Sequence, residues 1–388
     1  MHTQRRTGLP HLMGTFVLVS TAAAAEFGDP LRGLTPAELE RFTAGREAFA
    51  QVETAADGLG PVFNGTSCGG CHDVGAIGGG SELVETRFGT VTDGVFDPLA
   101  GLGGSLIQTD GIGVQGACTF VGEVVPPQAT IVAGRRTTPL FGLGLVDAVP
   151  DAELVALARQ QARFRPQTAG RPNFVTDVAT GLPAIGKFGW KSQVPSLLHF
   201  SADAYLNEMG ITTPLFPDES CPQGDCTLLV CDPVPGVDDD LEDVESFRDF
   251  MAFLAPPPPV RAGGATWQGG RLFAQVGCGD CHVPALVTGR SEVAALRRRI
   301  LQPYSDFLLH DMGSLGDGIE QGQATGREMR TAPLWGVRLM TTFLHDGRAH
   351  SIAEAILAHD GQGRRARDGF AALSAEKQTR LVAFVRGR

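Results

Sequence analysis

Five stretches of the chain repeat apolar positions with the 3.6-residue period of an amphipathic helix. They are Pro36 to Val52 and the ranges 151–163, 241–254, 291–301 and 373–386. Before the first stretch, Thr35 and Glu38 stand three residues apart, which is the spacing of a capping box, so a helix should begin at Pro36. The pattern predicts a mainly α protein whose helices are joined by long glycine- and proline-rich loops.

One long segment lacks the helical period. Residues 75–150 are rich in glycine and carry short alternating stretches such as Glu82 to Phe88, which are typical of strands. We therefore expect loops and minor β-hairpins there. An irregular segment of this length often covers a cofactor or shapes a binding surface.

The chemistry of the chain is concentrated in two Cys-x-x-Cys-His motifs, Cys68-Gly69-Gly70-Cys71-His72 and Cys278-Gly279-Asp280-Cys281-His282. Both thiols of such a motif can bond to the vinyl groups of a haem, and the histidine can ligate its iron. A thioredoxin-like pair does not need the histidine, and a zinc site would leave both histidines unexplained. The sequence therefore predicts two covalently bound haem c groups, with His72 and His282 as iron ligands.

The two halves of the chain repeat further blocks around these motifs. Residues 45–52 recur as 270–276 before the motif, and residues 136–143 recur as 330–337 after it. Four consecutive prolines, 256–259, form a stiff spacer between the halves. We expect a cytochrome c-like haem domain with large loop insertions at 26–255, a linker at 256–260, and a second cytochrome c-like haem domain at 261–388.

Haem c attachment takes place on exported chains, and the N-terminus has the features of a signal peptide at 1–25. Arg5 and Arg6 precede a short apolar run, Leu12 to Ser20, and three alanines end at Ala25. That run is too short for a stable membrane span, and no other run approaches membrane length. We expect an exported, soluble, periplasmic protein.

The chain is acidic, with 32 basic and 43 acidic residues and a net charge of −11. Removal of residues 1–25 would leave 30 basic residues against the same 43 acidic ones. This charge argues against nucleic acid and anionic membranes as partners. It is compatible with a small, basic electron-carrier protein, a cytochrome c or a cupredoxin.

Four cysteines lie outside the haem motifs: Cys118, Cys221, Cys226 and Cys231. An even number in an exported chain predicts two disulfides, and three pairings are open. The last three cysteines lie in a proline- and aspartate-rich loop, which a disulfide would staple. A metal site is the alternative, although no histidine lies nearby.

The sixth ligand of each iron decides the function, because iron with one protein ligand can bind peroxide, whereas iron with two mainly relays electrons. For the second haem, His359 is the candidate. It ends a segment that begins with Ser351 and Glu354 in capping-box spacing, and it shares a helix face with Ile352 and Ile356. A histidine at a helix end can instead interact with the helix dipole. His345 and His350 fit structural or solvent-facing roles better.

For the first haem, Met209 and His199 are the candidate ligands, and the third alternative is an open iron. Met209 precedes Gly210 at the end of a predicted helix, as His359 does in the other half, although methionine at such a position also serves core packing. Trp190 could relay electrons between the haems or be a buried aromatic anchor. His310 fits a hydrogen bond to a haem propionate or to the backbone.

Together these blocks resemble the di-haem cytochrome c peroxidase and MauG superfamily. The resemblance rests on the paired haem motifs, on Arg330-Thr331-Ala332-Pro333-Leu334-Trp335-Gly336 and on Phe343-Leu344-His345-Asp346-Gly347-Arg348. Residues 63–72, Phe188-Gly189-Trp190-Lys191 and Asn207-Glu208-Met209-Gly210-Ile211-Thr212 are similar to the di-haem oxidoreductase branch, also labelled thiol oxidoreductases. Thioether-bonded sulfurs cannot exchange with disulfides, so the thiol label does not fit the motif.

The resemblance implies two mostly helical cytochrome c domains with neighbouring haems, one peroxidatic and one for electron transfer. The peroxidases usually carry a methionine ligand at the position matching His359, and a histidine there would lower the haem potential. They also carry a distal acid, for which Glu82, Glu85 and Glu123 are the candidates here. We expect a di-haem oxidoreductase that reduces hydrogen peroxide. The alternatives are an electron carrier with both irons six-coordinate and a MauG-like oxidant of a partner protein's side chain.

Overall fold

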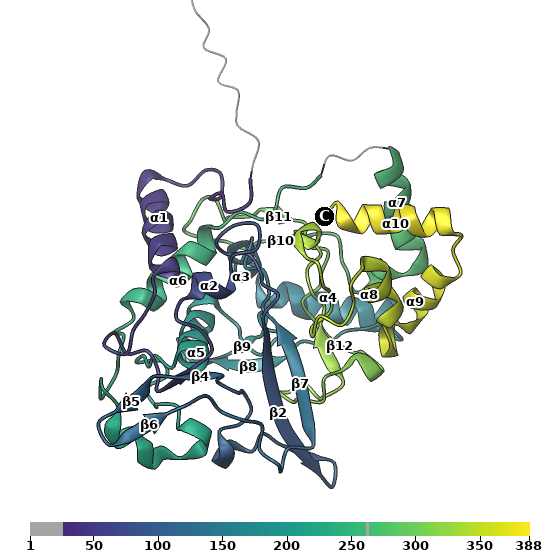
Figure 1. The fold of residues 1–388 in the computed structure, drawn as a ribbon. Coiled ribbons are helices and arrows are strands. Elements are labelled where there is room, and N and C mark those ends of the chain that lie inside the picture. Colours follow the sequence, from purple (N-terminus) through teal and green to yellow (C-terminus); the bar gives the residue numbers. More distant parts are fainter. Residues whose placement is uncertain (1–25, 261–263) are drawn as a thin grey trace, which may run out of the picture.

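The computed structural model describes residues 26–260 and 264–388, so the predicted signal peptide at 1–25 lies outside the described residues. Helices gather in two groups at opposite ends of the molecule (Figure 1). The first group contains α1 (Pro36–Ala50), α2 (Cys68–Cys71), α5 (Leu197–Met209) and α6 (Glu242–Phe253). The second contains α7 (Gly264–Val276), α8 (Ile352–Ala358), α9 (Arg364–Ala371) and α10 (Ala375–Arg386). Between them lie α3 (Leu143–Asp147) and α4 (Asp151–Phe164).

Each group is built on one close helix pair, and the repeated sequence block lies in that pair. A Cβ atom at Gly45 of α1 would collide with the Ser246 carbonyl of α6. A Cβ atom at Gly269 of α7, one residue before the repeated block 270–276, would collide with the Arg380 carbonyl of α10. A glycine is therefore required at each of the two helix contacts because it lets the two backbones touch.

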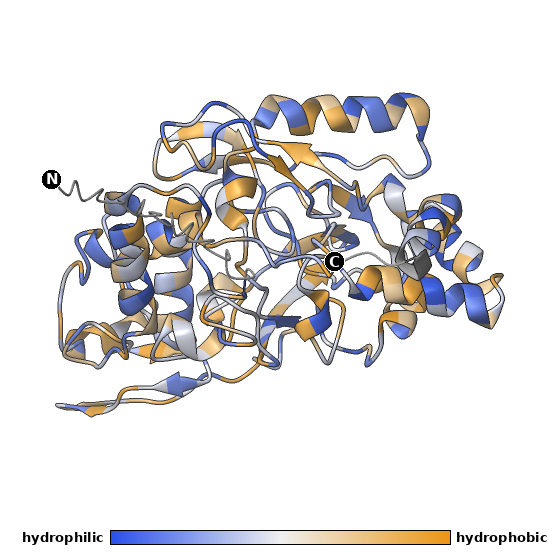
Figure 2. Cartoon of the chain, turned by 90° about the horizontal axis from the view of Figure 1, so that it is seen from above, coloured by the Kyte–Doolittle hydropathy of each residue, from blue (hydrophilic) through white to orange (hydrophobic). Residues whose placement is uncertain are grey.

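Four of the five predicted helices are confirmed. Helix α1 begins at Pro36, and the Thr35 side chain and the Glu38 carboxylate cap it reciprocally. Helices α4, α6 and α10 match the other three patterns within two residues. Figure 2 shows hydrophobic and hydrophilic residues alternating along the helices, which is the mark of one buried and one exposed face.

The helix predicted at 291–301 is wrong. The segment turns, and its end forms β11 (Ile300–Leu301), which pairs antiparallel with β10 (Leu286–Val287). The Thr288 hydroxyl accepts a hydrogen bond from the backbone N–H of Arg299 and donates one to the carbonyl of Leu296. This pairing and these bonds take the backbone out of the helical conformation, so tertiary contacts override the local pattern.

The loop-rich segment contains the hairpins that its alternation predicts. The longest strand, β2 (Val84–Thr92), pairs with both β3 (Val95–Asp97) and β7 (Ile131–Arg136). The other described sheets have two strands each: β1 (Val62–Phe63) with β4 (Asp110–Gly111), β5 (Gly113–Gln115) with β6 (Cys118–Phe120), β8 (Phe174–Asp177) with β9 (Leu182–Ile185), and β12 (Leu309–Asp311) with β13 (Glu328–Arg330). The fold is therefore mixed but mostly helical.

Two hydrophobic cores correspond to the two helix groups. The larger core contains buried side chains of α1, α5 and α6, and the smaller one those of α7, α8 and α10. The larger core also takes in residues that follow the proline run, among them Leu301, Phe307 and Trp335. The chain after the prolines thus packs into both cores. Among the described residues, no helix combines the length and the apolar character needed to cross a membrane.

The structure selects one of the three disulfide pairings. Cys118 of β6 is bonded to Cys231, and Cys221 is bonded to Cys226. The first bond spans 113 residues and fastens the loop before α6 to the β-hairpin, whereas the second closes a loop of only five residues. The predicted stapling role is confirmed for this loop.

Because loop-closure entropy grows with the span, Cys118→Ser with Cys231→Ser should lower the free energy of unfolding by about 5 kcal/mol. The matched control, Cys221→Ser with Cys226→Ser, should lower it by only about 2 kcal/mol. Denaturant unfolding followed by circular dichroism measures both values. Equal losses in the two pairs would contradict the entropic explanation.

Candidate functional site

The first haem motif forms α2, a single helical turn. The Ser67 side chain caps it by accepting a hydrogen bond from Gly70 N at 3.0 Å. The His72 ring follows, with its Nδ1 atom 2.9 Å from the carbonyl oxygen of Gly79. That contact assigns the ring proton to Nδ1 and leaves Nε2 available for a metal. Burial lowers the pKa of His72 to about 4, which keeps the imidazole neutral.

The second motif has the same construction. The His282 Nδ1 atom lies 2.8 Å from the Tyr304 carbonyl oxygen, and burial lowers the pKa of His282 to about 4. His282 lines a cavity of about 240 Å³, together with Cys278, Cys281 and His359. The structure thus brings both cysteines and both histidines of the predicted second haem site together.

His359 faces His282 across this cavity. It follows α8 as the C-cap residue, and its Nδ1 atom lies 2.7 Å from the Ala355 carbonyl oxygen, so its Nε2 is also available. The two imidazole centroids are 6.5 Å apart. Two imidazole–metal bonds of about 2 Å each, together with the ring radii, account for that separation. The predicted cap of α8 forms in part, because Ser351 accepts from Glu354 N while the Glu354 carboxylate accepts from His350 N.

The buried groups around these motifs fit haem. Arg330 is 8% exposed and lines the cavity; the Asp306 carboxylate, which pairs with His310, acts on its charge but does not form an ion pair with it. Burial lowers the pKa of its guanidinium to about 10. A buried cation without a counter-ion is costly, and a haem propionate would supply one. Burial also raises the pKa of Cys68 and of Cys278 to about 12, so neither thiol resembles the reactive thiolate of a redox enzyme.

Trp190 lies on the wall between this cavity and a second one of about 120 Å³, because it lines both. Its indole N–H donates to the carbonyl oxygen of Arg136 at 2.9 Å, and its own carbonyl accepts from Arg330 N at 2.8 Å. Arg136 and Arg330 are the equivalent first residues of the repeated block. The tryptophan is therefore held between the two copies of that block. His345 is buried, lines the first cavity, and packs edge-on against the indole.

A buried ion cluster fixes the residue after Trp190. The Lys191 ammonium lies 2.8 Å from one oxygen of Asp317, and the Arg135 guanidinium lies 2.7 Å from the other. The Lys191 and Asp317 side chains are 0% exposed and that of Arg135 is 2% exposed. Arg135 belongs to β7 and Asp317 follows the second haem motif, so the cluster joins the two halves of the chain beside the tryptophan.

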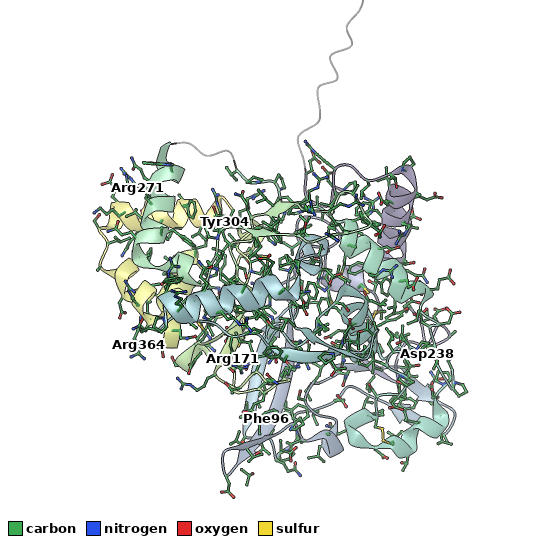
Figure 3. The ribbon with its side chains drawn as sticks, turned by 180° about the vertical axis from the view of Figure 1, so that it is seen from behind. Phe96, Arg171, Asp238, Arg271, Tyr304 and Arg364 are labelled. Atoms are coloured by element: carbon green, nitrogen blue, oxygen red, sulfur yellow. A yellow bond between two sulfur atoms is a disulfide. The ribbon has the colours of Figure 1, made fainter. Side chains whose placement is uncertain are left out.

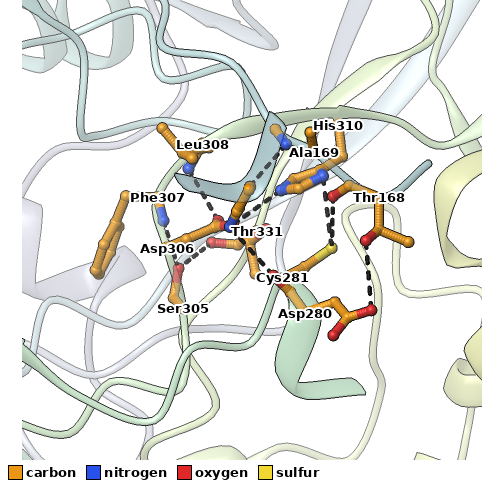
Figure 4. Close-up of polar contacts among 12 residues, drawn as sticks. Thr168, Ala169, Asp280, Cys281, Ser305, Asp306, Phe307, Leu308, His310 and Thr331 are labelled. Carbon is orange, nitrogen blue, oxygen red and sulfur yellow. Dashed lines mark hydrogen bonds and ion pairs between the residues drawn. The ribbon is translucent and has the colours of Figure 1, made fainter. Parts of the chain in front are cut away.

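His310 lies beside the second motif and is paired with a carboxylate (Figure 4). Its Nε2 atom is 3.0 Å from Asp306, and its Nδ1 atom is 3.4 Å from the Cys281 sulfur. Burial alone would lower the pKa of His310, but the Asp306 carboxylate raises it well above its usual value. Gln161 of α4 completes the network by donating to Asp306 at 2.7 Å. The charge of this imidazolium stands next to the second haem attachment site.

A half-buried pair of acidic side chains lies beside the first motif. Glu85 of β2 contacts Glu208 of α5, and the Arg87 side chain donates to Glu85 at 2.9 Å. Asn64 donates to Glu208 at 3.0 Å. Burial, and then the neighbouring Glu85 carboxylate, raise the pKa of Glu208 to about 8. The Glu208 carboxyl therefore favours its protonated form more than a free glutamate does, and Glu208 is close enough to raise the pKa of Cys71.

The other two acidic candidates have structural partners. Glu82 accepts hydrogen bonds from the Thr341 and Thr342 hydroxyls. Glu123 accepts from the backbone N–H groups of Gln108 and Gln223. Sequence analysis missed Glu208 as the partner of Glu85, because 123 positions separate them and no local pattern links them.

The candidate ligands of the first haem lie on α5. Met209 is 3% exposed within the larger core, and its carbonyl accepts from Gly60 N. His199 is buried, accepts from Val178 N at 3.3 Å, and lies 3.5 Å from Asp177. The carbonyl of the preceding Glu208 accepts from the N–H groups of Asn64 and Gly65, which ties the end of α5 to the strand before the motif. Met209 stays a prediction as the sixth ligand.

Comparison with known families agrees with this arrangement. Residues 127–387 match the family model described as "Di-haem oxidoreductase, putative peroxidase". The match covers more than half of the chain and includes the second haem motif, Trp190 and His359. The chain therefore belongs to this di-haem oxidoreductase family.

Solved structures of low sequence identity are also similar. Hydrazine synthase of Kuenenia stuttgartiensis has 15% identity and a TM-score of 0.43, over 98% of this chain and 100% of that one. The diheme peroxidase BthA of Burkholderia thailandensis has 15% identity and a TM-score of 0.40, over 91% of this chain and 86% of that one. A MauG-like protein associated with microbial copper homeostasis has 14% identity and a TM-score of 0.39, over 94% and 93%. No curated protein matches the chain.

The contribution of the Lys191–Asp317–Arg135 cluster to the free energy of unfolding can be tested. Asp317→Asn leaves Lys191 and Arg135 buried without a counter-charge, so the free energy of unfolding should fall by about 3–5 kcal/mol. The control Asp311→Asn removes the carboxylate from an exposed pair with Arg327 and should cost less than about 1 kcal/mol. Chemical denaturation of both variants compares the losses. Similar losses would show that burial does not strengthen this cluster.

Proposed function

We propose that this protein is an exported, periplasmic di-haem c oxidoreductase that reduces hydrogen peroxide. Electrons would enter at the haem attached to Cys278 and Cys281 and pass to the haem attached to Cys68 and Cys71. The observation that supports this division of roles is that the two candidate sites differ. Two imidazoles face each other at the second site, whereas two interacting carboxyl side chains, bonded by Arg87 and Asn64, lie beside the first.

Two histidines at one iron favour electron transfer, because no coordination position is left for a substrate. His282 and His359 would hold the second iron in this way. Each ring is oriented by the hydrogen bond of its Nδ1 atom to a backbone carbonyl. Arg330 would balance the charge of a propionate at the same site. The haems themselves supply the one-electron chemistry that no amino-acid side chain of this site offers.

Trp190 would lie on the path between the two haems. It lines the cavity of the second motif and a smaller cavity, whose lining contains none of the first motif's residues but includes Thr138, a backbone contact of His72. The bonds to Arg136 and from Arg330 fix its plane and position. A rigid aromatic side chain in that place shortens the gap that electrons have to cross. The neighbouring Lys191–Asp317–Arg135 cluster keeps it there.

Glu85 and Glu208 would handle the protons at the first site. Reduction of one peroxide to two waters consumes two electrons and two protons, and cleavage of the O–O bond requires a proton on the departing oxygen. The carboxyl pair holds one proton between its oxygens, and Arg87 keeps Glu85 in position. A carboxyl that both receives and returns a proton can serve this step as general base and then as general acid.

One observation favours a second candidate function. Met209 is buried at the end of α5, one residue after Glu208, which lies beside Cys71. If its thioether ligates the first iron in every redox state, both irons are closed and the protein is a di-haem electron carrier. The two disulfides support an oxidising compartment for either function.

Spectra of the purified holoprotein separate the two functions. For the peroxidase, we expect one high-spin haem, in the oxidised or the half-reduced protein, that reacts with hydrogen peroxide. The electronic absorption and electron paramagnetic resonance spectra should then change with one haem remaining low-spin. Two low-spin haems that ignore peroxide in every redox state would overturn the peroxidase proposal and leave the electron carrier.

The role of the carboxyl pair has its own test. Glu85→Gln should lower the rate of the reaction with peroxide by about 10²–10⁴-fold, because the amide cannot accept a proton. The control Glu123→Gln changes another buried glutamate, whose partners are backbone N–H groups, and should leave this rate within about threefold. Stopped-flow absorption measures both rates. An unchanged rate in Glu85→Gln would remove the residue from the mechanism.

A further inference from the structure

We propose that the electron donor is an acidic carrier protein that docks on an arginine-rich rim beside the second haem site. The rim is formed by Arg364, Arg365 and Arg367 at the start of α9. The inference rests on the proposed function in one respect, namely that electrons enter at the second haem. It reverses the expectation drawn from the overall charge, which favoured a basic carrier.

The charges of this chain are separated between its halves. Residues 26–255 contain 13 basic and 31 acidic residues, whereas residues 261–388 contain 17 basic and 12 acidic ones. The chain is acidic only because the N-terminal half is. In Figure 3, Arg271 and Arg364 lie at the outer edge of the α7–α10 group, and Asp238 lies toward the opposite end. A carrier that approaches the second haem therefore meets positive charge.

The three arginines occupy an electrostatically unfavourable place. They lie in the first turn of α9, where the helix dipole disfavours positive charge. Asp360 offsets part of the cost through ion pairs with Arg364 at 2.8 Å and with Arg367 at 3.6 Å, and Asp368 pairs with Arg367 at 2.8 Å. Arg365 is exposed and, among the described residues, has no ion-pair partner. A cluster that costs helix stability and stays partly unpaired is more typical of a binding surface than of a scaffold.

The cluster also lies where a carrier would have to approach. Arg365 and Arg367 line the same cavity as Cys278, Cys281 and His359, so α9 borders the second haem site directly. Arg364 and Arg365 are exposed at its rim. Carboxylates of a partner could reach them while its redox centre comes close to the cavity. Opposite charges at such a contact accelerate association and fix the orientation of the partner.

The holoprotein can be tested with two reduced electron carriers of similar size and potential, one with an acidic surface and one with a basic surface. Stopped-flow absorption follows reduction of the low-spin haem. The acidic carrier should react at least about tenfold faster at low ionic strength, and its rate should fall as salt is added. The charge reversal Arg364→Glu with Arg365→Glu should remove most of that advantage.

A matched control reverses two charges elsewhere in the same half. Arg297 and Arg298 are exposed, and neither lines the second haem cavity. Arg297→Glu with Arg298→Glu should change the rate with the acidic carrier by less than about twofold, because the charges lie away from the haem site. If both double variants slowed the acidic carrier equally, the rate would depend on the overall charge of this half and not on the arginines of α9. That result would overturn the proposed docking site.

Three further outcomes would overturn the docking site. The first is faster reduction of the haem by the basic carrier, and the second is a rate with the acidic carrier that does not change with salt. The third is a change of the haem reduction potential in Arg364→Glu with Arg365→Glu that is large enough to explain the slower rate. The last outcome would mean that these arginines neutralise propionates. Failure of the peroxide reaction with normal carrier kinetics would overturn the proposed function and leave the docking site standing.

Discussion

The clamp on Trp190 ties the two halves of the chain together beside the second candidate haem site. The indole N–H binds the backbone of one copy of the repeated block, and the carbonyl of the same residue is bound by the other copy. Lys191, the next residue, is buried in an ion cluster that spans both halves. Two duplicated units could slide against each other, but a shared residue tied to both cannot. The place of Trp190 in the wall of the second motif's cavity is thereby fixed.

The two halves are alike in their local construction, and the differences between them underlie the proposed division of roles. Each half has a glycine at a close helix contact and a motif histidine oriented by a backbone carbonyl. They differ at the helix end that follows. The second copy places an imidazole there, opposite its proximal histidine, whereas the first places Glu208 and Met209. The first site therefore offers a carboxyl beside a possible thioether ligand where the second offers an imidazole, and this difference underlies the proposal of substrate chemistry at one site only.

Features that depend on neighbours in the chain could be predicted from the sequence. The capping residues and apolar period located α1 within two residues of its end, and the motifs grouped cysteines with histidines that the structure brings together at the second site. Features that depend on distant pairs could not. Glu208 meets Glu85 and Asp317 meets Lys191 only after folding, and the segment 291–301 has a helical pattern that strand pairing with Leu286 and Val287 overrides. Disulfide pairing belongs to the same class, because four cysteines carry no mark of their partners.

The net charge of the chain, like the distant pairs, does not show how charges are arranged in space. A sum over the chain treats all charges as if a partner felt them together, but at physiological ionic strength the field of an exposed charge is screened over about 8 Å. A carrier at the proposed docking site would therefore respond to α9 and its surroundings more than to the acidic surface of the N-terminal half. The sign of the whole protein and the sign of one of its faces can differ for this reason. Under the proposal, the place of the arginines decides which partner fits, and that placement is a property of the fold.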